Sequence, residues 1–210
     1  MPTLSLGYFQ SIIDARREPR WAASSIVRRL TGGGAIWHDR ELTYAVTLPG
    51  DHPAARPNTG LYREIHAAIL EVLRRRGLDA HRRGPSEPPL GAPESSGKSP
   101  FLCFTDRDPE DIVFAASKIV GSAQRRRRGA ILQHGSILLG RSSATPELPG
   151  VAEFLATGPE PGDWAESVMG AIVARLGMDA CRIDPPAGLM ARAGELERSV
   201  YRDPGWTERR

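Results

Sequence analysis

Two apolar runs joined by a basic connection constrain the fold of this chain more than any other feature. The runs are KIV at residues 118–120 and AILQHGSILL at residues 130–139, and RRRRG at residues 125–129 lies between them. A short polar connection that ends in glycine between two such runs is typical of a β-hairpin. We therefore expect an antiparallel hairpin here, with a short strand before it at 112–114 and a turn at the small residues 121–123.

The remaining patterns predict further strands, followed by helices. Leu4, Leu6 and Tyr8 alternate with small or polar residues, which is typical of a half-buried strand. Asn58 or Thr59 is expected to cap a helix whose apolar residues follow helical spacing and which ends at Gly77. The same reasoning predicts strands at 26–27, 42–48 and 101–104 and a long exposed loop at 81–100. It also predicts two packing helices. One spans 163–177, where Asp163 and Glu166 form a capping-box-like start, and the other follows Pro186.

Composition excludes several classes of protein. The chain has 210 residues, of which 40% are apolar, so it can bury the core of one domain, and none of its runs is long enough to span a bilayer. Its start lacks the basic and apolar regions of a signal peptide, and we expect a cytoplasmic protein that binds no membrane. Cys103 and Cys181 are too few for a disulfide framework and lack the spacing of a zinc site.

Positive charge is gathered in clusters. The net charge is only +3, but arginines lie together at 74–76, 82–83 and 125–128. The first cluster suits the C-terminal end of a helix, where cations complement the helix dipole. The others attract acidic partners. Nucleic acid is the usual partner of such clusters, but no aromatic-rich RNA-binding strand, zinc finger or helix-turn-helix accompanies them. An acidic protein partner fits as well, and we expect no nucleic acid.

Two segments carry residues suited to chemistry. Three glycines at 32–34 either form a flexible loop or let the backbone approach a ligand closely. Cys103 is either a small buried side chain or a nucleophile whose thiolate a nearby cation stabilises. Lys118, between small and apolar residues, is either that cation or a strand lysine that faces solvent. Their spacing does not establish that the two side chains meet.

Several segments together resemble the biotin/lipoate protein ligase superfamily, and within it they are most similar to the cysteine-dependent octanoyltransferases of lipoate biosynthesis. The segments are TLSLGYFQ, VRRLTGGGAIWHDRELTYAV, the Cys103–Phe104 loop, KIVGSAQRRRRGAILQHGSILL and YRDPGWTERR. The resemblance spans nearly the whole chain. It implies an α+β fold, with a mostly antiparallel sheet flanked by helices, in a single catalytic domain over residues 1–210.

The resemblance also implies roles for particular residues. Cys103 would take an octanoyl group from an acyl carrier protein, and Lys118 would hold the cysteine as a thiolate and polarise the acyl carbonyl. The octanoyl group would then pass to a lysine of a lipoyl domain, such as the glycine cleavage H protein, without a cofactor or metal, and the arginines at 125–128 would dock these acidic partners. The residues expected to bind substrate are Arg29, Thr31, Gly33, Gly34, Ala35, His38, Gly121, Ser122, Ala123, His134 and Gly135.

One departure and three alternatives accompany the resemblance. Family members usually carry further elements before the strand at TLSLGYFQ, so we expect a chain that is truncated at its N-terminus. The alternative functions are an ATP-dependent lipoate ligase, an amidotransferase that moves octanoyl between lipoyl domains, and a non-catalytic protein that binds carrier domains. Cys103 favours transfer over ligation, because the ligases do not need this cysteine.

Overall fold

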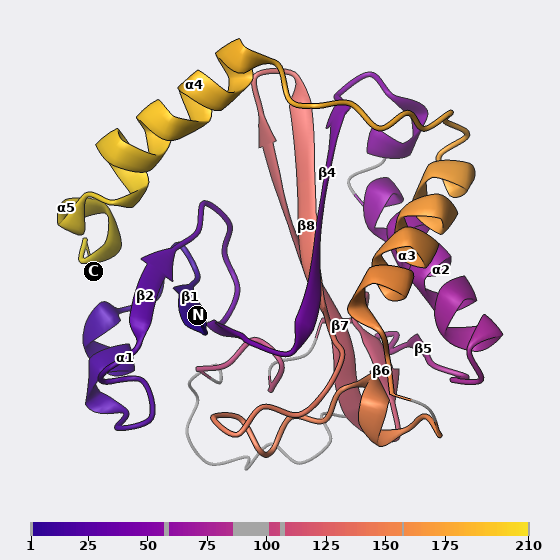
Figure 1. Ribbon diagram of the computed structural model, residues 1–210, viewed down its shortest axis with the longest axis horizontal. Helices are drawn as coiled ribbons and strands as arrows, with labels where there is room; N and C mark the ends of the chain where they lie inside the picture. The colour runs from indigo at the N-terminus through magenta and orange to yellow at the C-terminus, as the bar shows by residue number, and fades with distance from the viewer. Residues whose placement is uncertain (1, 57–58, 86–100, 106–107, 157, 210) are drawn as a thin grey trace. The chain divides into compact units, whose positions relative to one another are not determined.

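The computed structural model describes residues 2–56, 59–85, 101–105, 108–156 and 158–209. The chain divides into two compact units, which are coloured by residue number in Figure 1. The larger unit is the segment Arg40–Asp179, and the smaller unit combines Met1–Asp39 with Ala180–Arg210. None of the helices in the described ranges is long and apolar enough to cross a membrane.

The larger unit is built on an antiparallel sheet of five strands in the order β4-β8-β7-β6-β5. The strands are β4 (Glu41–Pro49), β5 (His81–Arg82), β6 (Ile112–Phe114), β7 (Ser117–Arg127) and β8 (Ala130–Leu138). β7 and β8 form the predicted hairpin, since Arg127 pairs with Ala130 across a two-residue turn. Arg128 and Gly129 have φ values of 51° and 73°, as a type I′ turn requires. The hairpin prediction is confirmed.

Two other predictions in this unit are wrong, and a third is wrong at its start. Residues 121–123 continue β7 instead of forming a turn, because each of them pairs with a residue of β8. Residues 101–104 form a turn and not a strand, although two of their apolar side chains are buried. The predicted loop at 81–100 begins with strand β5, and its residues 86–100 lie outside the described part of the chain.

Two long helices cover one face of this sheet (Figure 1). α2 (Gly60–Arg75) ends before Gly77, whose φ of 87° stops the helix as predicted. α3 (Pro161–Arg175) begins before the predicted start at Asp163, because the proline ring presets the φ of the first helical position. Short 3-10 turns, η1 (Pro53–Ala55) and η2 (Val151–Glu153), precede the two helices. The core between helices and sheet includes Leu61, Ile65, Ile69, Val72, Ile119, Val120, Ile131, Ile137, Trp164, Val168 and Ile172.

The smaller unit contains a three-stranded sheet in the order β2-β1-β3. β1 (Thr3–Leu6) pairs in parallel with β2 (Ser25–Arg28) and antiparallel with β3 (Ile36–His38), and α1 (Ile12–Arg17) lies between β1 and β2 in the chain. The expectation that β1 is half-buried is wrong, because it is the central strand and residues 4–6 are all buried. The five-stranded sheet is antiparallel, and the smaller sheet has one parallel and one antiparallel pair. Because most pairs are antiparallel and helices flank the sheets, the predicted α+β fold class is confirmed.

The C-terminal segment of the smaller unit is helical. It contains α4 (Ala187–Leu196), a π-helical turn η3 (Glu197–Tyr201) and α5 (Pro204–Thr207). The prediction that α4 packs in a core is wrong, since none of its residues is buried and Leu189 is 61% exposed. Helical spacing of apolar residues therefore located this helix but not its burial.

Arg28, in β2, holds the two ends of the smaller unit together. Its side chain is almost fully buried, with 1% of the residue exposed. Its Nη1 donates to the carbonyl oxygens of Gly7, Tyr8 and Gln10 at 2.9, 3.2 and 2.7 Å. Its Nε and Nη2 donate to the carbonyl oxygen of Thr207 in α5, at 3.1 and 2.8 Å. A single guanidinium group thus joins the N-terminal strands to the C-terminal helix.

Replacing Arg28 with methionine is expected to lower the free energy of unfolding by about 3 kcal/mol, because the carbonyl oxygens it serves lose their charged donor. Urea unfolding followed by tryptophan fluorescence measures the change, since Trp206 Nε1 donates to Arg28 O at 2.9 Å. Arg16→Met is the matched control. Arg16 also reaches the C-terminal segment, since its Nη2 lies 3.1 Å from Glu208 Oε1, but its side chain is 60% exposed. Its replacement should lower the free energy of unfolding by less than about 0.5 kcal/mol. Equal losses in the two variants would contradict the anchoring role.

Candidate functional site

Cys103 and Lys118 meet in the larger unit. Lys118 lies in β7 with 5% of the residue exposed, and its Nζ is 3.6 Å from Cys103 Sγ and 2.9 Å from Cys103 O. Cys103 itself is half-buried in the turn at 101–105. The ring of Phe104 lies over the ammonium, with its centroid 5.5 Å from Nζ. Lys118 is therefore not a solvent-facing strand lysine, and a sulfur atom lies beside a buried cation.

Asp111 completes this site, and sequence reasoning missed it. Its Oδ2 lies 2.8 Å from Lys118 Nζ, and both side chains are 4% exposed. The same oxygen accepts a hydrogen bond from Asp108 N at 2.6 Å, which closes a turn over 108–111. Burial favours the neutral amine, but attraction to Cys103 and Asp111 prevails and raises the pKa of Lys118. Burial raises the pKa of Asp111, and the Lys118 ammonium opposes that rise.

A β-bulge sets the direction of Lys118. The register between β6 and β7 shifts so that Ile119 is an extra residue on β7. In a regular strand, residues 118 and 120 would share a face. Here Val120 points into the core under the helices, whereas the side chain of Lys118 runs over Gly121 on the other face. The bulge thus turns the ammonium away from the core and towards Cys103.

Replacing Gly121 with alanine is expected to slow alkylation of Cys103 by iodoacetamide about tenfold at neutral pH, because a nearby cation promotes thiolate reactivity. A Cβ at this position would lie 2.7 Å from Lys118 Cε and 3.2 Å from Nζ, so the ammonium must move. Stability should fall by no more than about 1 kcal/mol, since a flexible side chain gives way. Gly170→Ala is the matched control, because a Cβ there meets nothing within 4 Å. Unchanged alkylation of the Gly121 variant would contradict this view of the site.

The face of the sheet that carries the ammonium also carries some of the residues predicted to bind substrate. Alternation along β7 and its register with β8 place Gly121, Ala123 and His134 on this face. His134 pairs with Ala123 and is half-buried. Ser122 and Gly135 pair with each other and lie on the opposite face, which α2 covers. The predicted residues of the hairpin are therefore divided between the two faces.

Ser122 belongs to a buried polar network on the helix-covered face. Its Oγ bonds His66 Nε2 at 2.6 Å and also the hydroxyl of Tyr44, and its carbonyl oxygen accepts from Tyr62 at 2.7 Å. Burial raises the pKa of Tyr44 to about 12 and lowers that of His66 to about 4, so both are neutral at pH 7. A Cβ at Gly135 would lie 2.7 Å from Ser122 Oγ, so glycine is needed here for packing. Sequence reasoning identified neither His66 nor the tyrosines.

The glycine loop lies in the smaller unit, where Arg29 holds it. Arg29 Nη2 donates to Gly32 O and Gly34 O at 2.9 and 2.6 Å, and its Nη1 donates to Ser5 O at 2.9 Å. Gly33 is exposed and has a φ of 88°, a value that favours glycine. Of the two alternatives that the sequence left open, these bonds argue against a flexible loop, because one guanidinium group fixes its backbone.

The remaining predicted residues also belong to the smaller unit. Thr31 and Ala35 are buried, with 3% and 0% exposed, and His38 is half-buried at the end of β3. Cys103 and Lys118 belong to the larger unit. The geometry therefore brings together the predicted nucleophile and cation, while the shared substrate pocket and the role of each residue in it stay predictions.

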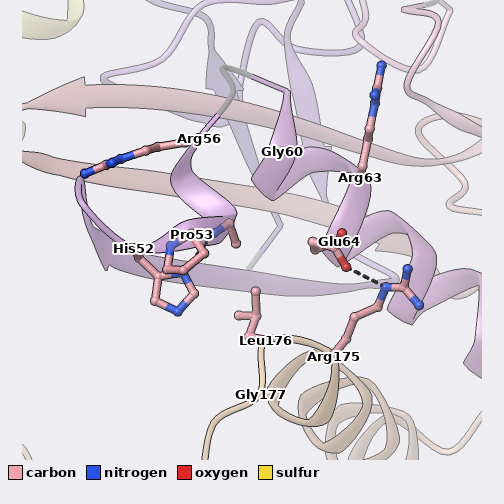
Figure 2. A pocket seen from close by; sticks show the side chains of 10 residues that line it. His52, Pro53, Arg56, Gly60, Arg63, Glu64, Arg175, Leu176 and Gly177 are labelled. Atoms are coloured by element: carbon pink, nitrogen blue, oxygen red, sulfur yellow. Dashed lines mark hydrogen bonds and ion pairs between the residues drawn. The ribbon is translucent and has the colours of Figure 1, made fainter.

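Two hollows on the larger unit are lined by other residues. One, of about 410 Å³, lies between β4 and α3 and is mainly apolar. The other, of about 720 Å³, lies between the start of α2 and the end of α3 (Figure 2). Figure 2 shows that the side chain of Arg175 points to Glu64, whereas those of Arg56 and Arg63 extend outwards. Arg175 Nε lies 2.8 Å from Glu64 Oε2. The positive charges around this hollow therefore do not converge. In the part of the chain that the structure describes, histidine, cysteine and carboxylate side chains form no group of three or more that could hold a metal ion.

Two solved structures with a similar fold are lipoate-protein ligases. Lipoate-protein ligase A bound with ATP matches with a TM-score of 0.75 and 22% identity, over 99% of this chain and 82% of that chain. A bi-partite lipoate protein ligase from Thermoplasma acidophilum, described together with its E2 lipoyl domain, matches with a TM-score of 0.72 and 21% identity, over 99% of this chain and 80% of that chain. The class that these likenesses define is the lipoate-ligase catalytic fold.

The sequence comparisons are more specific. The model of the lipoyl protein ligase A/B catalytic domain matches residues 1–146, and the chain belongs to this family. Octanoyltransferase LipM of Kyrpidia tusciae is 43% identical over 144 residues, and that of Geobacillus kaustophilus is 44% identical over 142 residues, each over 66% of this chain. The chain spans about half the length of these relatives, 51% and 50%. The resemblance predicted from the sequence motifs is confirmed.

Proposed function

We propose that this protein is an octanoyltransferase that carries the octanoyl group as a thioester on Cys103. The observation that carries the proposal is the Lys118 ammonium 3.6 Å from Cys103 Sγ. The supporting finding is the similarity, at 43% identity, to a relative named as an octanoyltransferase. A buried cation beside the sulfur of the half-buried Cys103 suits a step in which sulfur attacks a carbonyl carbon.

In the first half-reaction, Cys103 Sγ attacks the carbonyl carbon of an octanoyl thioester on an acyl carrier protein. The new carbon–sulfur bond forms, the bond to the carrier sulfur breaks, and the carrier leaves as a free thiol with the proton that Cys103 gives up. The Lys118 ammonium stabilises negative charge on Sγ before the attack and on the carbonyl oxygen during it. Asp111, whose Oδ2 lies 2.8 Å from Lys118 Nζ, keeps this ammonium charged and in place.

In the second half-reaction, the amine of a lysine on a lipoyl domain attacks the thioester carbon. An amide bond forms, the carbon–sulfur bond breaks, and Cys103 recovers its proton. The backbone of Gly121 and Ala123, on the face that carries Lys118, borders the reacting carbonyl.

The partners of both half-reactions are carrier domains, which the resemblance implies are acidic. The hairpin tip supplies the opposite charge, because residues 126–128 are exposed arginines. Arg126 Nη2 donates to Ala55 O at 2.7 Å, so the tip is held against the segment before α2. Charge attraction at such a patch steers an acidic domain to the surface and speeds association more than it tightens binding.

The experiment that tests this function mixes the protein with an octanoyl-acyl carrier protein and a lipoyl domain, without ATP, and follows the mass of the lipoyl domain. Octanoylation of its lysine is the expected result. Modification that needs free octanoate or lipoate with ATP would show a ligase instead. Modification from an octanoylated lipoyl domain but not from acyl carrier protein would show an amidotransferase. Binding of either carrier without any transfer would show a non-catalytic protein.

A further inference from the structure

His66 in α2 touches both the sheet and the turn that carries Asp111. It is fully buried, with 0% exposed. Its Nδ1 lies 2.5 Å from Glu110 O, and its Nε2 lies 2.6 Å from Ser122 Oγ. Glu110 is the chain neighbour of Asp111, whose carboxylate pairs with Lys118. One side chain thus connects the helix, strand β7 and the 108–111 turn.

The partners of His66 determine which of its nitrogens carries the proton. Burial lowers its pKa to about 4, so the ring is neutral at pH 7 and has one N–H group. The carbonyl oxygen of Glu110 can only accept, so Nδ1 carries the proton and donates to it. Nε2 then accepts from the hydroxyl of Ser122, whose oxygen accepts from Tyr44. Each donor in this series of hydrogen bonds has a defined acceptor, which gives the His66 ring one orientation.

The other main-chain anchors of the turn come from the edge of the sheet. The N–H groups of Arg83 and Gly84 donate to Asp111 O and Pro109 O, both at 2.9 Å. These two residues follow β5, a strand of two residues at the end of the sheet. Short edge strands are among the weakly held parts of a sheet. His66, by contrast, reaches the turn from the buried face of α2.

We propose that His66 is a positioning residue: its bond to the Glu110 carbonyl holds Asp111 where its carboxylate keeps the Lys118 ammonium beside Cys103 Sγ. The inference rests on the proposed function in one respect, that Cys103 is the reacting group. The link is short, because Asp111 follows Glu110 directly and lies 2.8 Å from Lys118 Nζ. A displacement of about 1 Å at a reacting group is enough to slow a reaction strongly.

Two amide variants separate the two bonds of His66. An asparagine amide can take the place of Nδ1 and keep a donor for Glu110, whereas a glutamine amide can take the place of Nε2 and keep the partner of Ser122. The readout is the rate at which iodoacetamide alkylates Cys103 at neutral pH, measured by peptide mass, with Cys181 in the same sample as the reference. His66→Asn should stay within about twofold of the unaltered protein, and His66→Gln should be about tenfold slower, although both lose thermal stability. Equal rates in the two variants, or a greater loss in His66→Asn, would overturn the proposal.

A measurement on the unaltered protein covers the case in which neither variant folds. Nitrogen-15 NMR of the histidine side chains should show the His66 proton on Nδ1, and a proton on Nε2 would overturn the proposal.

Octanoyl transfer by the unaltered protein, measured alongside, separates this inference from the proposed function. If transfer is absent while the two variants still differ in Cys103 alkylation, the proposed function fails and the positioning role of His66 is supported.

Discussion

Replacing Cys103 with alanine is expected to lower octanoyl transfer by at least about 10³-fold, because the reaction then lacks the sulfur that carries the acyl group. The fold should be retained. Cys103 is half-buried, and alanine removes only its sulfur atom, so the free energy of unfolding should change by less than about 1 kcal/mol. Transfer is measured by the mass of the lipoyl domain at several times after mixing.

Cys181→Ala is the matched control for this prediction. Cys181 is the other cysteine of the chain and is exposed, in the segment before α4. Its replacement should leave the rate of transfer within about twofold of the unaltered rate, as surface substitutions away from a site generally do. Full activity of Cys103→Ala, or a comparable loss in Cys181→Ala, would mean that Cys103 does not carry the octanoyl group.

Replacing Lys118 with methionine is expected to lower kcat for transfer by about 10³-fold with little change in KM, because the charge acts on the reacting atoms. Methionine keeps most of the length and apolar contacts of the lysine side chain. It leaves Asp111 buried without its partner, however, and removing one member of a buried ion pair costs about 3–5 kcal/mol. Steady-state kinetics with varied carrier concentration give kcat and KM separately.

The double variant Lys118→Met with Asp111→Asn separates chemistry from folding. It removes both buried charges, so most of the stability that Lys118→Met loses should return. Activity should not return with it, because no cation is restored beside Cys103. Recovery of transfer in the double variant would show that Lys118 acts through stability alone.

Much of the fold could be predicted because its signals are local. The β7–β8 hairpin follows from two apolar runs joined by a short basic connection that ends in Gly129, whose φ of 73° suits the turn. α2 follows from apolar spacing that ends at Gly77. The turn at 101–105 could not be predicted in this way, because Leu102 and Phe104 are buried by tertiary packing and not by strand pairing. A short apolar run looks the same in either case.

The site was predictable in its members but not in its geometry. Cys103 and Lys118 follow from the family motifs, but their contact depends on the bulge at Ile119, and nothing in the sequence IVG marks an extra residue. Asp111 lies in a stretch, DPED, that is typical of a capped turn of helix and does not by itself indicate a site. A signal for His66 was available, since a polar residue falls on the apolar face of α2 next to Ile65.

The most direct test of the central proposal is the mass of the protein after brief exposure to octanoyl-acyl carrier protein in the absence of a lipoyl domain. We predict a single octanoyl adduct, located by peptide mass on Cys103, that disappears when a lipoyl domain is added. Octanoylation of the lipoyl domain with no adduct on Cys103 at any time after mixing, or an adduct on Cys181 in its place, would contradict it.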